Sequence, residues 1–172
     1  MSGVLSGSTE FAEALSKGRV ELLAPFSGRV VPLEEVPDPV FSEKMLGDGL
    51  ALDPVEGIGV APVTGKLTVF HSACHAFAVQ ATDEVGVLVH VGLNTVQMKG
   101  EGFTRLAEVG DEVVAGQEIV RFDLAAIESA GYSPLSPVIL PDLPAGYQVE
   151  KTTAPTVRAG QDVLLTVIWR TD

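Results

Sequence analysis

The chain of 172 residues is poor in cysteine and basic residues, and it has no long apolar run. Its single cysteine, Cys74, excludes a disulfide within the chain and favours a reducing compartment. No apolar run approaches the ~20 residues of a membrane-spanning helix, and no basic start with an apolar core indicates a signal peptide. We therefore expect a cytoplasmic protein without stable membrane insertion.

Positive charge is also scarce, because 11 Lys and Arg residues stand against 23 Asp and Glu residues, for a net charge of −12. Without a basic patch to neutralise phosphates, nucleic acid is excluded as a partner. Basic proteins are the natural complement of such a surface, through electrostatic steering. The alternative is that the acidity only maintains solubility.

Two regions differ in pattern. Residues 1–18 contain apolar positions at helical spacing, including Phe11 and Leu15, with Gly18 placed to end a turn. They predict a flexible tail with at most a short helix, whose apolar face could alternatively contact a membrane. Residues 19–172 read as one domain of short Val, Ile and Leu runs separated by Gly, Pro and Asp.

This punctuation is typical of an all-β sandwich or barrel with little helix. Two similar stretches, 24–28 (APFSG) and 61–65 (APVTG), indicate repeated hairpin units within one domain rather than two domains. Residues 124–129 predict one helical turn, residues 141–147 a loop, and residues 163–169 the closing strand.

The histidines lie in a predicted β-hairpin. Residues 75–80 and 85–91 read as strands joined by a turn at residues 82–84. In the second strand, four valines (Val85, Val87, Val89 and Val91) share one face, which places His90 and Leu88 on the other. A two-residue turn at positions 82 and 83 would pair His75 directly with His90, with Phe77 and Leu88 beside them.

Two facing imidazoles suit either nucleophilic chemistry or metal binding. A neutral imidazole can attack phosphorus while a second one donates a hydrogen bond to phosphoryl oxygens. The third histidine, His71, reads as surface or core filler, and Cys74 as packed rather than reactive.

Four motifs in order make the chain recognisable: 36–49 (VPDPVFSEKMLGDG), 75–77 (HAF), 89–96 (VHVGLNTV) and 99–103 (KGEGF). Over about residues 20–168 the sequence resembles the glucose-family enzyme IIA of the bacterial sugar phosphotransferase system. The resemblance implies a β-sandwich of flattened-barrel form and a phosphotransferase component that needs no cofactor or metal.

The resemblance further implies that His90 accepts a phosphoryl group from the phosphocarrier HPr and passes it to a cysteine of an enzyme IIB domain. His75 would orient the phosphoryl group. A shallow apolar docking rim around His90 would comprise Asp38, Val40, Phe41, Met45 and Val96, and we expect Phe41 to be exposed there rather than in the core. Two positions depart from the family pattern: Ala73 stands where a threonine is common, and Asn94 where an acid is frequent.

Three other classes remain as alternatives. A zinc-dependent hydrolase or metallopeptidase would need a third protein ligand and a general base besides the two histidines. A biotinyl or lipoyl carrier would use Lys99, which more simply reads as a loop lysine. A purely regulatory module would bind target proteins instead of, or in addition to, carrying phosphate. The sequence does not identify the sugar.

Overall fold

The alternating valines predicted to face the core do so. In the computed structural model, which describes residues 9–171, Val85, Val87, Val89 and Val91 are fully buried, whereas His90 is half-buried on the opposite face. Burial of one strand face in this way is what drives a sheet to pack against a second layer.

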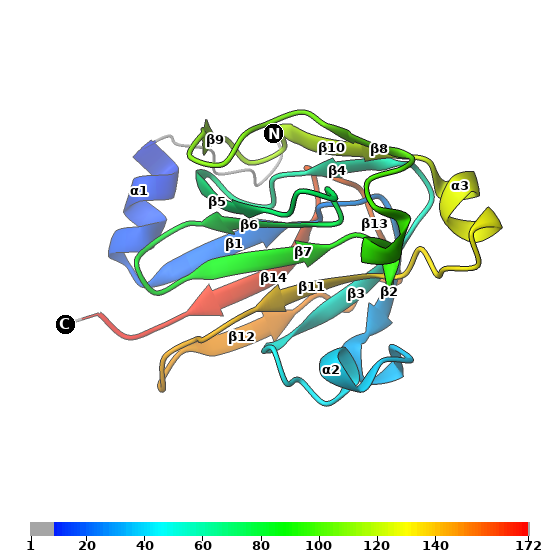
Figure 1. The fold of residues 1–172 in the computed structure, drawn as a ribbon. Coiled ribbons are helices and arrows are strands. Elements are labelled where there is room, and N and C mark those ends of the chain that lie inside the picture. The colour runs from blue at the N-terminus through cyan, green and yellow to red at the C-terminus, as the bar shows by residue number, and fades with distance from the viewer. Residues whose placement is uncertain (1–8, 172) are drawn as a thin grey trace.

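Strands dominate the described residues (Figure 1). They are β1 (Arg19–Leu23), β2 (Gly28–Pro32), β3 (Asp48–Pro54), β4 (Ile58–Val60), β5 (Gly65–Phe70), β6 (Ala76–Gln80), β7 (Gly86–His90), β8 (Phe103–Arg105), β9 (Glu112–Val113), β10 (Glu118–Phe122), β11 (Ser136–Leu140), β12 (Gln148–Lys151), β13 (Thr156–Val157) and β14 (Val163–Ile168). The helices are short: α1 (Thr9–Ser16), α2 (Pro39–Ser42) and α3 (Leu124–Ser129), with 3-10 turns η1 (Leu33–Glu35) and η2 (Thr95–Met98).

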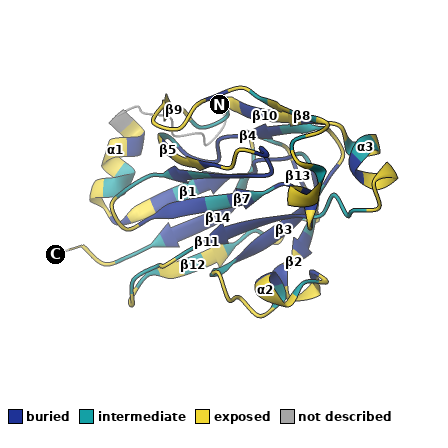
Figure 2. Ribbon diagram, in the orientation of Figure 1, coloured by how far each residue is buried: buried dark blue, intermediate teal, exposed yellow. Residues whose placement is uncertain are grey.

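The strands form three antiparallel sheets within the described part of the chain. The largest has the order β13-β2-β3-β11-β7-β6-β5-β9, and the smaller ones have the orders β1-β14-β12 and β4-β10-β8. Side chains from all three pack into one hydrophobic cluster, for example Leu22 of β1, Val87 of β7 and Ile119 of β10. In Figure 2 the buried residues follow the strands, and exposed residues lie mainly on helices and loops. The predicted all-β sandwich with little helix is confirmed.

Most local predictions agree with these elements. Helix α3 coincides with the predicted helical turn at 124–129, and β14 with the predicted closing strand. Gly28 and Gly65, from the two similar stretches, each begin a strand that pairs with the next strand in sequence. A Cβ atom at either glycine would meet a backbone carbonyl oxygen of that neighbour, Asp53 O or Gln80 O. Both stretches therefore use glycine for the same close approach of two backbones.

The predicted N-terminal tail contains α1, and residues 1–8 lie outside the described part. Phe11 of α1 is buried in the main hydrophobic cluster, and Leu15 packs partly against it. Gly18, with φ of 76°, follows the end of the helix. The apolar face of α1 is thus occupied by the protein's own core.

Candidate functional site

His90 is the last residue of β7, and its ring is fixed by a hydrogen bond to the next turn. Its Nδ1 lies 2.7 Å from the carbonyl oxygen of Gly92. Because a carbonyl oxygen only accepts, Nδ1 must carry the proton. The neutral ring therefore has its lone pair on Nε2, the nitrogen available for nucleophilic attack.

The turn that supplies this carbonyl is itself held in place. Gly92 has φ of 72°, and its N–H donates to Ser136 Oγ of β11 over 3.0 Å. Thr95 Oγ1 donates to Val91 O just before the turn. A Cβ atom at Gly92 would collide with the Thr95 side chain and Ser133 O. Glycine is needed here both for its conformation and for space.

The hairpin that carries the histidines forms, but its register differs from the prediction. Ala76 pairs with His90 and Phe77 with Val89, so His75 is not directly opposite His90. The turn is longer than two residues, because the N–H groups of Ala81 and Thr82 both donate to Val85 O.

Strict alternation also fails before β6. Phe77 is fully buried and packs at a tilt against Phe70 in the core, so it does not lie beside the histidines as predicted. His75 precedes the strand and follows Cys74, whose φ of 64° turns the chain sharply. The two rings nevertheless meet, with centroids 5.0 Å apart and an edge-to-face angle of 72°.

The environment of His75 disfavours a charge on its ring. Its side chain is buried, at 6% exposure, and its Nδ1 has no hydrogen-bond partner within residues 9–171. Burial lowers the pKa of His75 to about 4, and the charges of His90 and His71 contribute in the same direction. His75 is therefore a neutral imidazole near pH 7.

Opposing effects act on His90. Burial lowers its pKa, whereas the hydrogen bond to Gly92 O and the Asp38 carboxylate raise it, and His71 lowers it. The net direction is downward, which favours the neutral, nucleophilic ring.

His71 joins the same cluster of rings, which sequence reasoning missed. Its ring centroid is 4.3 Å from that of His75. The residue is exposed, as one of the two predicted readings had it, but it contacts the site. Only the turn at residues 72–74 brings the two rings together, so spacing along the chain gave no signal.

Phe41 does not belong to an exposed rim. It is 5% exposed and packs in a cluster around η1, β3 and β11; the cluster comprises Val31, Leu33, Val36, Phe41, Ala51, Leu93 and Ile139. The predicted exposure of Phe41 is wrong because these distant segments cover it. Its ring edge still contacts His90, with centroids 5.3 Å apart.

The other predicted rim residues do reach the surface. Val40, Met45 and Val96 are exposed, Met45 at 68%. Asp38 is half-buried and caps α2, its Oδ1 accepting from the Val40 N–H over 3.0 Å. Leu46, beside Met45, is also exposed. Where large exposed apolar side chains form one patch, the patch is typical of a protein docking surface.

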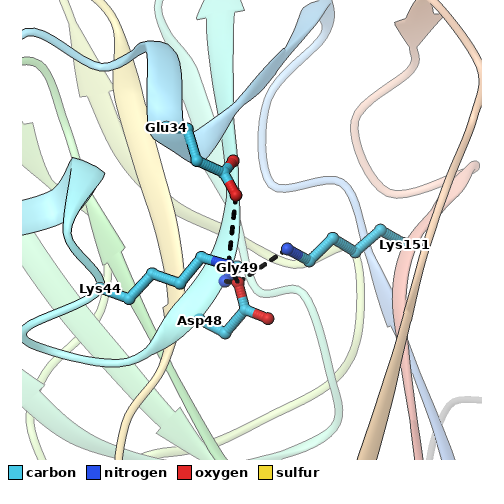
Figure 3. A network of polar contacts seen from close by, with 5 residues as sticks. All are labelled: Glu34, Lys44, Asp48, Gly49 and Lys151. Atoms are coloured by element: carbon cyan, nitrogen blue, oxygen red, sulfur yellow. Dashed lines mark hydrogen bonds and ion pairs between the residues drawn. The ribbon is translucent and has the colours of Figure 1, made fainter.

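A charged network anchors the segment that carries Met45 (Figure 3). Lys44 Nζ lies 3.2 Å from Glu34 Oε2 of η1 and 3.5 Å from Asp48 Oδ1. Lys151 Nζ of β12 donates to the same Asp48 oxygen over 2.7 Å. Burial raises the pKa of Asp48, but the bonds to Lys151 and the Gly49 N–H outweigh it and hold that pKa below its usual range.

The side chains of the described residues restrict the chemistry that is available at the histidine site. Within residues 9–171 no three His, Cys, Asp or Glu side chains gather in a way that could hold a metal ion. No helix in this described part is both long and apolar enough to cross a membrane.

The site thus brings two imidazoles into contact on a β-sandwich, an arrangement that suits group transfer on histidine. Residues 20–144 match the model of a protein family described as "phosphoenolpyruvate-dependent sugar phosphotransferase system, EIIA 1". The chain belongs to this family. It is an EIIA component of that phosphotransferase system.

Proteins with known names are similar to this chain over most of its length. A "PTS system glucose-specific EIIA component" of Oceanobacillus iheyensis is 38% identical over 87% of this chain and 90% of its own length. The protein of the same name from Haemophilus influenzae is 41% identical over 85% of this chain and 87% of its own length. The solved glucose permease IIA of Mycoplasma capricolum superposes with a TM-score of 0.80 at 37% identity, over 86% of this chain and 95% of that one.

Proposed function

We propose that this protein is a cytoplasmic phosphoryl carrier that accepts phosphate from phospho-HPr on His90 and passes it to a cysteine of an enzyme IIB domain. The observation that carries the proposal is the hydrogen bond from His90 Nδ1 to Gly92 O, 2.7 Å long. It selects Nε2 as the nucleophile in a protein of the EIIA family.

The transfer needs positioning more than acid or base strength. The Nε2 lone pair of His90 attacks phosphorus, a bond from nitrogen to phosphorus forms, and the bond from phosphorus to HPr breaks with its electron pair returning to HPr. In the second step the IIB thiolate attacks, and the pair of the broken bond returns to Nε2. Nδ1 keeps its proton throughout, donating it in the hydrogen bond to Gly92 O, so the ring is in the correct tautomer for both steps.

His75 is proposed to orient the phosphoryl group. Its Nδ1 is buried without a partner, and an unpaired buried donor is costly. The proton is therefore expected on Nε2, from which it can be donated to a phosphoryl oxygen. Because its ring lies 5.0 Å from that of His90, this N–H is within reach of a group bound there.

The surface around His90 suits two successive protein partners. We propose that Val40, Met45 and Val96 form the docking rim, with Phe41 supporting it from beneath and Asp38 holding α2. The net charge of −12 would steer basic partners toward the protein. Since the two curated relatives are named glucose-specific, we expect the IIB partner to belong to a permease of that kind.

The test is reconstitution with phosphoenolpyruvate, enzyme I and HPr, followed by intact-mass measurement. We expect the wild type to gain one acid-labile phosphoryl group and His90→Ala to gain none, because no other ring offers a free Nε2 held in this way. His75→Gln is the matched control and should still gain the group. A stoichiometric, acid-labile phosphate on His90→Ala would contradict the proposal.

A further inference from the structure

All three histidines of the chain lie in one cluster, although the transfer reaction requires only two of them. The ring of His71 lies closer to His75, at 4.3 Å between centroids, than His90 does, at 5.0 Å. The planes of His71 and His75 are inclined by 61°, an edge-to-face contact of the kind that aromatic rings prefer. His75 is thus in contact with both of the other rings.

His71 is rigidly placed. Its Nδ1 accepts the Ala73 N–H over 3.0 Å, which fixes the ring against the turn. Its carbonyl oxygen accepts from Cys74 N–H over 2.8 Å and from the Arg105 guanidinium over 2.9 Å, and its own N–H donates to Ala76 O over 2.9 Å. The guanidinium also covers the Phe70 ring at 4.0 Å. Ring and backbone of His71 are therefore both tied to neighbouring structure.

His75, in contrast, lacks a hydrogen bond that would orient it through Nδ1. That atom is buried and has no partner among residues 9–171. A second-sphere group usually fixes the orientation and tautomer of a functional histidine through this nitrogen. The His75 ring contacts the rings of His71 and His90, and of these two His90 must itself be free to carry a group.

We propose that His71 is a positioning residue for phosphoryl transfer, whose fixed ring holds His75 toward His90. The proposal rests on the carrier function proposed above. His71 is exposed and does not itself contact the reacting atoms. It acts by limiting the rotation of the His75 ring, so that the N–H of His75 points to the phosphoryl group as this group passes to the IIB domain.

Three variants separate the ring contact from the turn. His71→Phe keeps an aromatic ring against His75 but removes the acceptor for the Ala73 N–H. His71→Asn keeps an acceptor near that N–H but removes the ring. His71→Ala removes both. Val69→Thr, an exposed change of similar size on β5, is the control for surface effects.

The measurement is rapid-quench kinetics of acceptance from phospho-HPr and of transfer to a purified IIB domain, with melting curves for every variant. We expect His71→Ala and His71→Asn to lower kcat of onward transfer by about three- to tenfold, the range that an aromatic pair contact supports. KM for the IIB domain should stay unchanged. His71→Phe should remain within about twofold of the wild type, as should Val69→Thr.

Several results would overturn the proposal. Wild-type kinetics in His71→Asn, or slow transfer in His71→Phe alone, would show that the transfer rate depends on the turn and not on the ring of His71. A higher KM with unchanged kcat would make His71 a docking residue instead. If His71→Ala fails to fold, the comparison of His71→Phe with His71→Asn still tests the proposal. If the wild type accepts no phosphoryl group, it is the carrier function that fails.

Discussion

The low pKa of His75 makes the stability of the fold depend on pH. Protonation of this ring costs little in the unfolded chain, where histidine titrates near 6.5, but in the folded protein it occurs only near pH 4. The unfolded state therefore binds more protons between these values, and stability falls as the pH falls. The side chain is buried at the rim of the site, so the charged ring loses much of its hydration there.

The size of the effect follows from the difference between the two states. At 1.36 kcal/mol per pH unit, the loss of stability is at most about 3 kcal/mol between pH 7 and pH 4, and at most about 2 kcal/mol of it occurs by pH 5. His75→Gln cannot titrate and should lose correspondingly less. A loss of this size is a large fraction of the stability of a typical domain.

The assay is urea unfolding of wild type and His75→Gln at pH 7, 6, 5 and 4. The single tryptophan, Trp169, is a suitable fluorescence probe because its ring stacks on Tyr147 with centroids 5.2 Å apart. Carboxylates titrate in both proteins, so the comparison isolates His75. The two stabilities should diverge as the pH falls from 7 to 4. Parallel curves would refute the claim that burial suppresses the charge of this ring.

Three other outcomes follow from the site. For His75→Gln, acceptance from phospho-HPr should survive and onward transfer should slow severely. An amide can donate a hydrogen bond, but unlike an imidazole it cannot take up a proton when the anionic phosphoryl group lies beside it; stopped assays of each step check this, and equal losses would contradict it. Phe41→Ser should cost at least about 3–5 kcal/mol in thermal or urea unfolding, since the ring is buried. Met45→Ser should change stability by less than about 0.5 kcal/mol but weaken HPr binding in a calorimetric titration. Unchanged HPr affinity would remove Met45 from the rim.

Much of the architecture was accessible from local patterns. Alternation in residues 85–91 predicted which face is core, because side chains in a strand must point alternately to its two sides. The short runs between glycine and proline predicted a β-sandwich, and the four motifs indicated the family. The same alternation placed His90 outside the core, where its ring lies half-buried.

The register of the hairpin was not accessible in the same way. The Thr82 side chain accepts the N–H groups of Glu84 and Val85, which stabilises a turn longer than the two-residue one. One additional turn residue shifts every pairing along β6 and β7. Turn length depends on such local side-chain bonds, which the pattern of apolar residues does not report.

Sequence alone therefore determined the β architecture and the buried face of β7, because both follow from residues close together in the chain. The resemblance of its motifs to a known family indicated His90 as the candidate nucleophile. Tertiary structure decided which side chains surround it. Phe41 is buried because β3 and β11 cover it, and His71 meets His75 because a left-handed residue at Cys74 reverses the chain. Contacts of this kind depend on how distant segments pack, and packing is set by the whole core rather than by any one stretch of sequence.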